Sequence, residues 1–246
     1  MKLAIFSDLH LAADGANQCT ASAGELVELC ERLEARADRV LVAGDLFNLD
    51  RAPVPGAAER CLQGLRAKMP EVVERLERFD WLFGNHDRAL AADGVPEERT
   101  YEADGRRILA LHGHQFDMWL KRLPGLAPTA NFVAGWLDRA GLQPVSAAMG
   151  IVPHALDRIR TRLGGDGDTT DRGLEGARQF IVQGGWDVVV CGHSHQLRLV
   201  PCAGGLFVNT GSLTCGHLEW VLIDTTTRRV EAYRDGAIVQ SEELQA

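Results

Sequence analysis

Short apolar runs that stop abruptly at a polar residue recur along the chain and predict buried β-strands. The run 40–43 ends at Gly44-Asp45. Four further runs end in the same way at an Asp, Asn or His: 5–6 before Asp8 and His10, 81–83 before Asn85 and His86, 108–111 before His112, and 188–190 before His193 and His195. Ligands of open α/β sheets gather beyond the carboxyl ends of the strands, so we expect these side chains to converge.

Helical patterns separate the first three of these strands. Ser22 and Glu25 form a capping box that begins a helix over 23–37. A second helical stretch covers 56–79 and restarts at Pro70, which suits the first turn of a helix. This strand–helix–strand rhythm predicts a largely parallel central sheet. Residues 99–111 then predict a hairpin around Ala103-Asp104-Gly105.

The rhythm changes after this hairpin. Residues 115–185 have a helical pattern with Pro and Gly interruptions, including a helix near 171–183, and we interpret them as a helical insertion, or cap, within a single domain 1–246. Its apolar residues, such as Trp119, Phe132 and Trp136, suit either the core of a subdomain or a lid. Short strands then resume and predict a second, antiparallel or mixed sheet: 187–191, 197–200, 205–209, 219–224 and 229–234.

Charge and composition restrict the classes of partner and the cellular location that we expect. The net charge is −8, which argues against long nucleic acid because no general attraction to a polyanion follows from it. The six cysteines show no CxxC pairing and the first residues enter a strand without a signal-peptide pattern, so we expect a cytoplasmic protein with reduced thiols. No apolar run reaches the roughly 18 residues of a membrane span.

The polar residues at the strand ends predict a metal site. Four histidines, two aspartates and Asn85 form a mixed imidazole and carboxylate set that suits Mn²⁺, Fe or Zn²⁺ and lacks the thiolates of many structural zinc sites. Seven ligands exceed what one ion needs, whereas two ions about 3.5–4 Å apart would use them all. His86 is placed to protonate a departing oxygen, and Asp87 to orient the His86 imidazole.

These five blocks, taken in order, resemble the signature of the calcineurin-like metallophosphoesterases. The resemblance implies a four-layer α/β/β/α sandwich of two mixed sheets and hydrolysis of a phosphoester by metal-activated hydroxide, with Mn²⁺ as the expected metal. It further implies that Asp45 bridges the two ions and that His86 is catalytic. The first ion would be held by Asp8, His10 and His195, and the second by Asn85, His112 and His193.

One branch of the family is particularly similar. The run His112-Gly113-His114-Gln115-Phe116-Asp117, followed by an apolar helical insertion, resembles the UDP-2,3-diacylglucosamine pyrophosphatases, in which the insertion covers acyl chains. Those enzymes have Gly-Asn-Arg-Asp where this chain has Gly84-Asn85-His86-Asp87. The substrate is therefore left open between a phosphorylated small molecule and a lipid- or nucleotide-linked one, and the bond between a monoester, a diester and a pyrophosphate. A lipid-linked substrate would bring peripheral contact with the inner face of a membrane.

Two other functions remain as alternatives. Repair nucleases of the Mre type share the Gly-Asp-Leu-Phe and Gly-Asn-His-Asp blocks, but they need a basic DNA-binding face. A catalytically silent scaffold of the same fold would bind a protein partner, although such scaffolds lose metal ligands that this chain retains. Candidate substrate contacts are His114, Arg158 and Arg162, the two arginines also suiting a solvated helix face.

Overall fold

The computed structural model describes residues 1–14, 17–50, 58–116 and 171–245, together with 133, 136, 137, 140 and 142. Its strands are β1 Lys2–Phe6, β2 Arg39–Ala43, β3 Asp80–Leu82, β4 Glu98–Ala103, β5 Arg106–Leu111, β6 Val188–Cys191, β7 Arg198–Cys202, β8 Gly205–Asn209, β9 Glu219–Asp224, β10 Arg229–Arg234 and β11 Ala237–Glu243. Its helices are α1 Ala23–Arg36, α2 Ala58–Lys68, α3 Pro70–Leu76 and α7 Asp171–Gly184, with short 3₁₀ helices η1 Arg88–Asp93 and η2 His114–Phe116.

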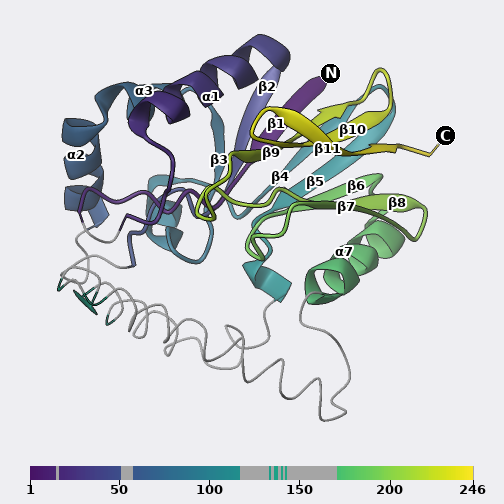
Figure 1. The fold of residues 1–246 in the computed structure, drawn as a ribbon. Helices are drawn as coiled ribbons and strands as arrows, with labels where there is room; N and C mark the ends of the chain where they lie inside the picture. The colour runs from purple at the N-terminus through teal and green to yellow at the C-terminus, as the bar shows by residue number, and fades with distance from the viewer. Residues whose placement is uncertain are drawn as a thin grey trace.

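Two mixed sheets lie face to face between helices (Figure 1). The six-stranded sheet has the order β11-β10-β9-β1-β2-β3, and the five-stranded sheet has the order β4-β5-β6-β8-β7. Helices α1, α2 and α3 lie on one side of the sandwich and α7 on the other (Figure 1). The predicted sandwich of two mixed sheets is confirmed, and the helices on both outer faces give it four layers.

Apolar side chains, which point alternately to the two faces of the strands, form three apolar cores. Ala4 and Phe6 of β1 pack toward the helices α1 and α3, whereas Leu3 and Ile5 pack between the sheets. In the other sheet, Val189 of β6 faces α7. Both faces of these strands are therefore covered, which explains why they are continuous apolar runs in the sequence.

Parallel pairing brings the carboxyl ends of the strands together. β1 pairs with β2, and β2 with β3, in parallel. β5, β6 and β8 are likewise parallel. The antiparallel β9 completes the other side of β1. Because each parallel strand ends in the same direction as its neighbours, the polar residues that follow these strands lie along one edge of their sheet.

Local signals in the sequence explain the element boundaries. The Ser22 hydroxyl accepts the Glu25 N–H at 3.3 Å and the Glu25 carboxylate accepts the Ser22 N–H at 2.8 Å, which is the predicted capping box of α1. Helix α3 begins at Pro70, as predicted. The β4–β5 turn places Asp104 and Gly105 at φ 52° and 72°, the left-handed pair that a tight hairpin requires.

Side chains join the two sheets at both sides of the sandwich. The Gln240 amide of edge strand β11 accepts the Leu199 N–H at 2.9 Å and donates to the Leu199 carbonyl at 2.6 Å, on edge strand β7. On the opposite side, Arg99 of β4 donates to the Trp81 carbonyl of β3 at 3.3 Å, and the Tyr101 hydroxyl donates to Asp80 at 3.2 Å. Each pair of edge strands is thus tied together through side chains.

Two elements differ from the prediction. Strand β11 was not predicted, because its largely exposed residues, apolar at the start and polar after that, lack a buried face. Helix α7 lies inside the predicted insertion 115–185, yet its Ala177 and Ile181 pack on the five-stranded sheet. The insertion was therefore extended too far, and α7 is the fourth layer of the sandwich.

Trp119, Phe132, Arg158 and Arg162 lie outside the described residues. Among the described helices, none is both long and apolar enough to cross a membrane.

Candidate metal centre

Backbone conformations in the left-handed region mark the candidate ligands. Five of the seven have positive φ values: Asp8 57°, His10 50°, Asp45 51°, His193 65° and His195 54°. Such conformations cost about 1–3 kcal/mol each and persist only where the surroundings enforce them. Here the strand ends are connected by backbone hydrogen bonds, from Asp8 N–H to the Gly44 carbonyl at 3.1 Å and from His10 N–H to the Asp45 carbonyl at 3.0 Å.

The structure gathers the predicted ligands into overlapping groups. Asp8, His10 and His195 place ligand atoms within 4.8 Å of one another, and so do Asp45, His112 and His193. A third group joins His10, Asp45 and His86, so Asp45 shares a group with residues of both sides. The three groups together contain every predicted ligand except Asn85, and the division of these residues between two ions stays a prediction.

Each aspartate has one oxygen fixed by the protein and the other directed at histidines. Asp45 Oδ1 accepts the His86 N–H at 2.8 Å, while Asp45 Oδ2 lies 3.1 Å from His112 Nε2 and 3.8 Å from His10 Nε2. Asp8 Oδ2 accepts the hydroxyl of Ser7 and the N–H of His193, while Asp8 Oδ1 lies 3.1 Å from His195 Nε2. Both carboxylates therefore present one oxygen to the same small space.

Buried polar atoms that make no hydrogen bond indicate whether a metal fits this space. His10 Nε2, His112 Nε2 and Asn85 Oδ1 are buried and make no hydrogen bond of good geometry among the described residues, although His112 Nε2 lies 3.1 Å from the charged Asp45 Oδ2. A buried polar atom without a partner is costly and calls for an explanation. Imidazole nitrogen, amide oxygen and carboxylate oxygen are all ligands of divalent ions. The residues thus fit the metal that the family implies.

Partners on the far side of the imidazoles orient them. The His112 Nδ1–H donates to the Ala43 carbonyl at 2.9 Å. Asn48 Oδ1 lies 2.9 Å from His10 Nδ1, and the Thr214 hydroxyl lies 3.3 Å from His195 Nδ1. Such outer partners hold the ring and leave Nε2 toward the metal. The sequence prediction missed Asn48 and Thr214, because only the folded chain brings them against a ligand.

His86 has an orienting carboxylate, but it is not the predicted one. Its Nδ1 lies 2.9 Å from Asp50 Oδ1, and the Asp50 N–H donates to the His86 carbonyl at 3.1 Å. The His86 ring lies edge-on to His10, with centroids 4.7 Å apart. The prediction that Asp87 orients His86 is therefore wrong.

Asp87 instead connects two loops. Its carboxylate is fully buried and accepts the N–H groups of Leu46, Phe47 and Gly84 at 2.7, 3.3 and 2.6 Å. Burial and the neighbouring Asp45 raise the pKa of Asp87 to about 7, against the stabilisation that the N–H groups give its ionised form. Because it holds the loops after β2 and β3 together, Asp87 is a structural residue of the centre.

Opposite charges decide the ionisation of the ligands. Burial favours the neutral form of Asp8, but His195 and His112 hold the pKa of Asp8 well below its usual value, and His112 and His86 act likewise on Asp45. Burial lowers the pKa of His112, yet Asp45 and Asp8 raise it to about 10 overall. At His10 the effect of burial is larger than that of Asp8 and Asp45, so the pKa of His10 is lowered. The metal-free centre therefore combines ionised carboxylates with a protonated His112.

Metal binding should release protons. A ligating imidazole must be neutral, and His112, with a pKa of about 10, is protonated at pH 7, so metal bound at His112 should displace about one proton. Affinity should accordingly fall as the pH falls, because protons compete for the ligand. Calorimetric titration with Mn²⁺ in buffers of different ionisation enthalpy measures the number released. Heats that are independent of the buffer would contradict this.

Of the three candidate substrate contacts, the structure describes only His114. His114 lies beside the centre, its ring centroid 5.6 Å from that of His112, and its Nε2 is 3.4 Å from Glu97. Burial and the neighbouring His112 and His193 lower the pKa of His114 to about 3, so this imidazole is neutral. Arg158 and Arg162 lie outside the described residues, and their predicted role stays a prediction.

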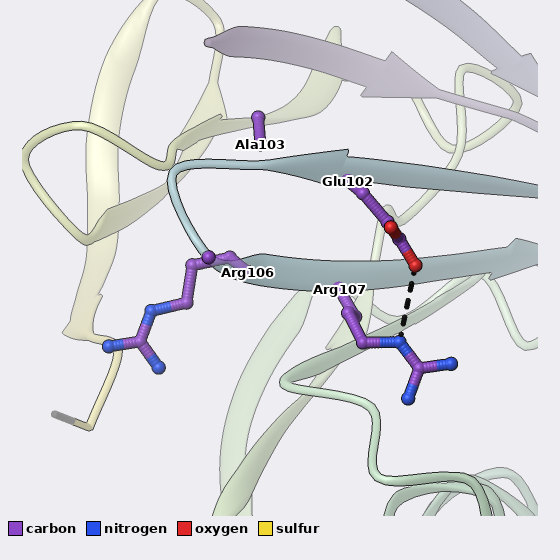
Figure 2. A pocket seen from close by; sticks show the side chains of 5 residues that line it. Glu102, Ala103, Arg106 and Arg107 are labelled. Carbon is purple, nitrogen blue, oxygen red and sulfur yellow. Dashed lines mark hydrogen bonds and ion pairs between the residues drawn. The ribbon is translucent and has the colours of Figure 1, made fainter.

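A hollow elsewhere on the surface is separate from the metal centre. Figure 2 shows it at the β4–β5 turn, where Arg107 faces Glu102. Arg106 pairs with Asp187 at 2.8 Å, so both arginines are already engaged with acidic residues. The hollow lies at the beginning of β5, whereas His112 follows the end of the same strand. It therefore takes no part in the candidate site.

A two-sheet sandwich with histidines, aspartates and an asparagine at its strand ends defines the class of metal-dependent phosphoesterases. The chain belongs to the calcineurin-like phosphoesterase family, whose model matches residues 1–197. No curated protein matches the chain.

Solved structures share the fold. A single mutant of Vps29 from Entamoeba histolytica is 16% identical, with a TM-score of 0.52 and full coverage of both chains. Wild-type Vps29 of that organism, complexed with Zn²⁺, is 18% identical, with a TM-score of 0.52 and coverage of 99% of this chain and 98% of that one. The phosphoesterase Yfce from E. coli is 14% identical over the whole of both chains, with a TM-score of 0.48. At these identities the likeness to the two Vps29 structures shows the fold alone.

Proposed function

We propose that this protein is a dinuclear metal-dependent phosphoesterase that hydrolyses a phosphomonoester, phosphodiester or pyrophosphate bond. The observation that carries the proposal is the pair of ligand groups linked through Asp45, in which buried His10 Nε2, His112 Nε2 and Asn85 Oδ1 make no hydrogen bond among the described residues. Two positions that share one carboxylate suit a pair of divalent ions.

The metal positions use the residues of both sheets. Asp8, His10 and His195 would hold one ion, and Asn85, His112 and His193 the other, with Asp45 between them. Mixed nitrogen and oxygen ligands suit Mn²⁺ first, and also Fe or Zn²⁺. When bound, such ions lower the pKa of water and withdraw charge from a phosphoryl oxygen.

His86 and Asp50 supply the proton chemistry. The Nδ1–H of His86 donates to the Asp50 carboxylate, and we assign to the other ring nitrogen the role of protonating the leaving oxygen. Asp50 also stabilises the imidazolium form that donates a proton. Burial of both side chains, with exposures of 14% and 15%, keeps water from competing for this contact. His86 therefore acts as the general acid, and Asp50 orients it.

The substrate is a phosphorylated small molecule or a lipid- or nucleotide-linked one. The block His112-Gly113-His114-Gln115-Phe116-Asp117 supports the second class through its resemblance to the UDP-2,3-diacylglucosamine pyrophosphatases, and His86 in place of their arginine supports simple esters equally. A cytoplasmic enzyme with peripheral membrane contact suits the lipid-linked substrate. The net charge of −8 argues against long nucleic acid.

Hydrolysis assays with added Mn²⁺ test the proposal. The substrates are p-nitrophenyl phosphate, bis-p-nitrophenyl phosphate and a UDP-linked acyl sugar, with metal-chelated protein as the blank. We expect metal-dependent turnover of at least one of them. Selective turnover of the acyl sugar would identify a lipid-linked substrate, and turnover of the small esters alone would identify a soluble one. Absence of turnover despite bound metal would favour the silent scaffold instead.

A further inference from the structure

The asparagine that follows the Gly-Asp motif contacts His10 at two points. Asn48 is 1% exposed, and its side chain lies against the ring and the backbone of His10. Asn48 Oδ1 is 2.9 Å from His10 Nδ1, and Asn48 Nδ2 donates to the His10 carbonyl at 3.2 Å. The Asn48 N–H also donates to the Leu11 carbonyl at 2.9 Å. The side chain is thereby fixed to the loop that carries His10.

The backbone contact determines which way round the amide lies. The nitrogen and oxygen of an asparagine amide are assigned from their hydrogen bonds. A carbonyl oxygen can only accept, so the amide end that faces the His10 carbonyl has to be the NH₂ group. The reversed amide would place two acceptors against each other in a buried site. The Asn48 oxygen is therefore the end that faces the imidazole.

The amide orientation in turn determines the tautomer of the imidazole. An amide oxygen only accepts, so His10 Nδ1 has to carry the hydrogen. In a neutral ring, Nε2 is then the unprotonated nitrogen with its lone pair. This nitrogen is buried without a hydrogen-bond partner among the described residues, and it lies 3.7 Å from Asp8 Oδ1 and 3.8 Å from Asp45 Oδ2.

We propose that Asn48 is a positioning residue that fixes His10 as the Nδ1–H tautomer and so presents Nε2 as a ready metal ligand. The inference rests on the proposed metal centre for its consequence, but the tautomer itself is a property of the metal-free protein. A neutral amide performs this role without adding a third buried charge beside Asp8 and Asp45. Loss of an outer partner of this kind typically lowers metal affinity 10- to 100-fold.

The first experiment uses the unmodified protein. Histidine side chains labelled with ¹⁵N give two-bond ¹H–¹⁵N correlations that distinguish the two neutral tautomers. Without metal at pH 8, above the ordinary pKa of a histidine, we expect a proton on Nδ1, because the Asn48 oxygen accepts there. His10→Gln assigns the signal by its disappearance. A proton on Nε2 of His10 in the unmodified protein would overturn the proposal without reference to any other variant.

Variants then test the consequence for metal binding. Asn48→Leu removes both hydrogen bonds, so the Nδ1–H preference should be lost and Co²⁺ affinity, followed by titration of its visible absorption, should fall about 10- to 100-fold. Asn48→Asp keeps the acceptor that faces His10 Nδ1 and should keep the tautomer, although its second oxygen meets the His10 carbonyl and should lower the stability of the fold. Asn17→Leu is the matched control, since the Asn17 amide bonds the backbone of Ala12 and Cys19 in the same loop but no histidine.

The outcomes separate this proposal from the proposed function. Unchanged Co²⁺ affinity in a folded Asn48→Leu, or an equal loss in Asn17→Leu, would overturn the positioning role. If the unmodified protein shows Nδ1–H at His10 but binds no Co²⁺, the tautomer assignment is upheld and the metal-dependent phosphoesterase is refuted. Circular dichroism and urea unfolding establish that each variant is folded before it is titrated.

Discussion

Replacing Asp45 by asparagine should lower kcat by about a thousandfold or more, because in the proposed centre this one carboxylate would serve both metal positions. Its Oδ2 lies within 4 Å of His10 Nε2 and of His112 Nε2, which belong to different ligand groups. The amide keeps the size of the side chain but removes the charge that attracts two cations. A thousandfold loss corresponds to about 4 kcal/mol of transition-state stabilisation.

Metal content and kcat should fall together in this variant. Elemental analysis after dialysis should give less than the two ions per chain expected of the unmodified protein. Asp187→Asn is the control, because Asp187 also accepts hydrogen bonds from Arg106 and Arg107 but lies at the beginning of β6, away from the centre. If Asp45→Asn retained activity within tenfold of the unmodified enzyme, Asp45 would not be the shared ligand.

Replacing His86 by alanine should lower kcat by about 10²- to 10⁴-fold while leaving the metals bound. The ring is oriented by Asp50 and lies beside His10, but its proposed role is to protonate the leaving oxygen. The loss should therefore depend on the leaving group. An alkyl phosphate, whose alkoxide leaves poorly, should show the full loss, whereas p-nitrophenolate leaves readily and should show a smaller one.

Two further variants sharpen this second prediction. Asp50→Asn should reduce kcat in the same leaving-group-dependent way but by a smaller factor, since the acid remains and only its orienting carboxylate is lost. His217→Ala is the control, because His217 forms an exposed pair with Asp235 outside the centre. An equal loss with both leaving groups, accompanied by loss of metal, would instead make His86 a ligand.

The sequence predicted that the candidate ligands converge, because their positions follow a simple rule. Each buried strand is a continuous apolar run, and its first polar residue after the run lies at the carboxyl edge of the sheet. The convergence of Asp8, Asp45 and His112 therefore followed from the positions of the strand ends along the chain. The order of the five blocks supplied the family, and the fold followed from the family and from the strand count.

The errors came from features that no local pattern encodes. Asp87 was chosen as the partner of His86 because it is adjacent in sequence, but successive side chains diverge, and the partner comes from Asp50 of another loop. Helix α7 was assigned to the cap because an amphipathic helix does not reveal which surface it covers. Strand β11 is defined by its pairing with β10, since its exposed residues lack a strand period.

Closure of the sandwich by side chains bears on how the protein behaves at high concentration. An open edge strand presents unpaired N–H and carbonyl groups on which a second molecule can extend the sheet. Gln240 occupies both backbone groups of Leu199, and Arg99 occupies the Trp81 carbonyl. At these positions another copy finds no free template for strand addition. The same contacts that complete the fold thus occupy backbone groups of the edge strands β7 and β3 on which a second molecule could extend the sheet.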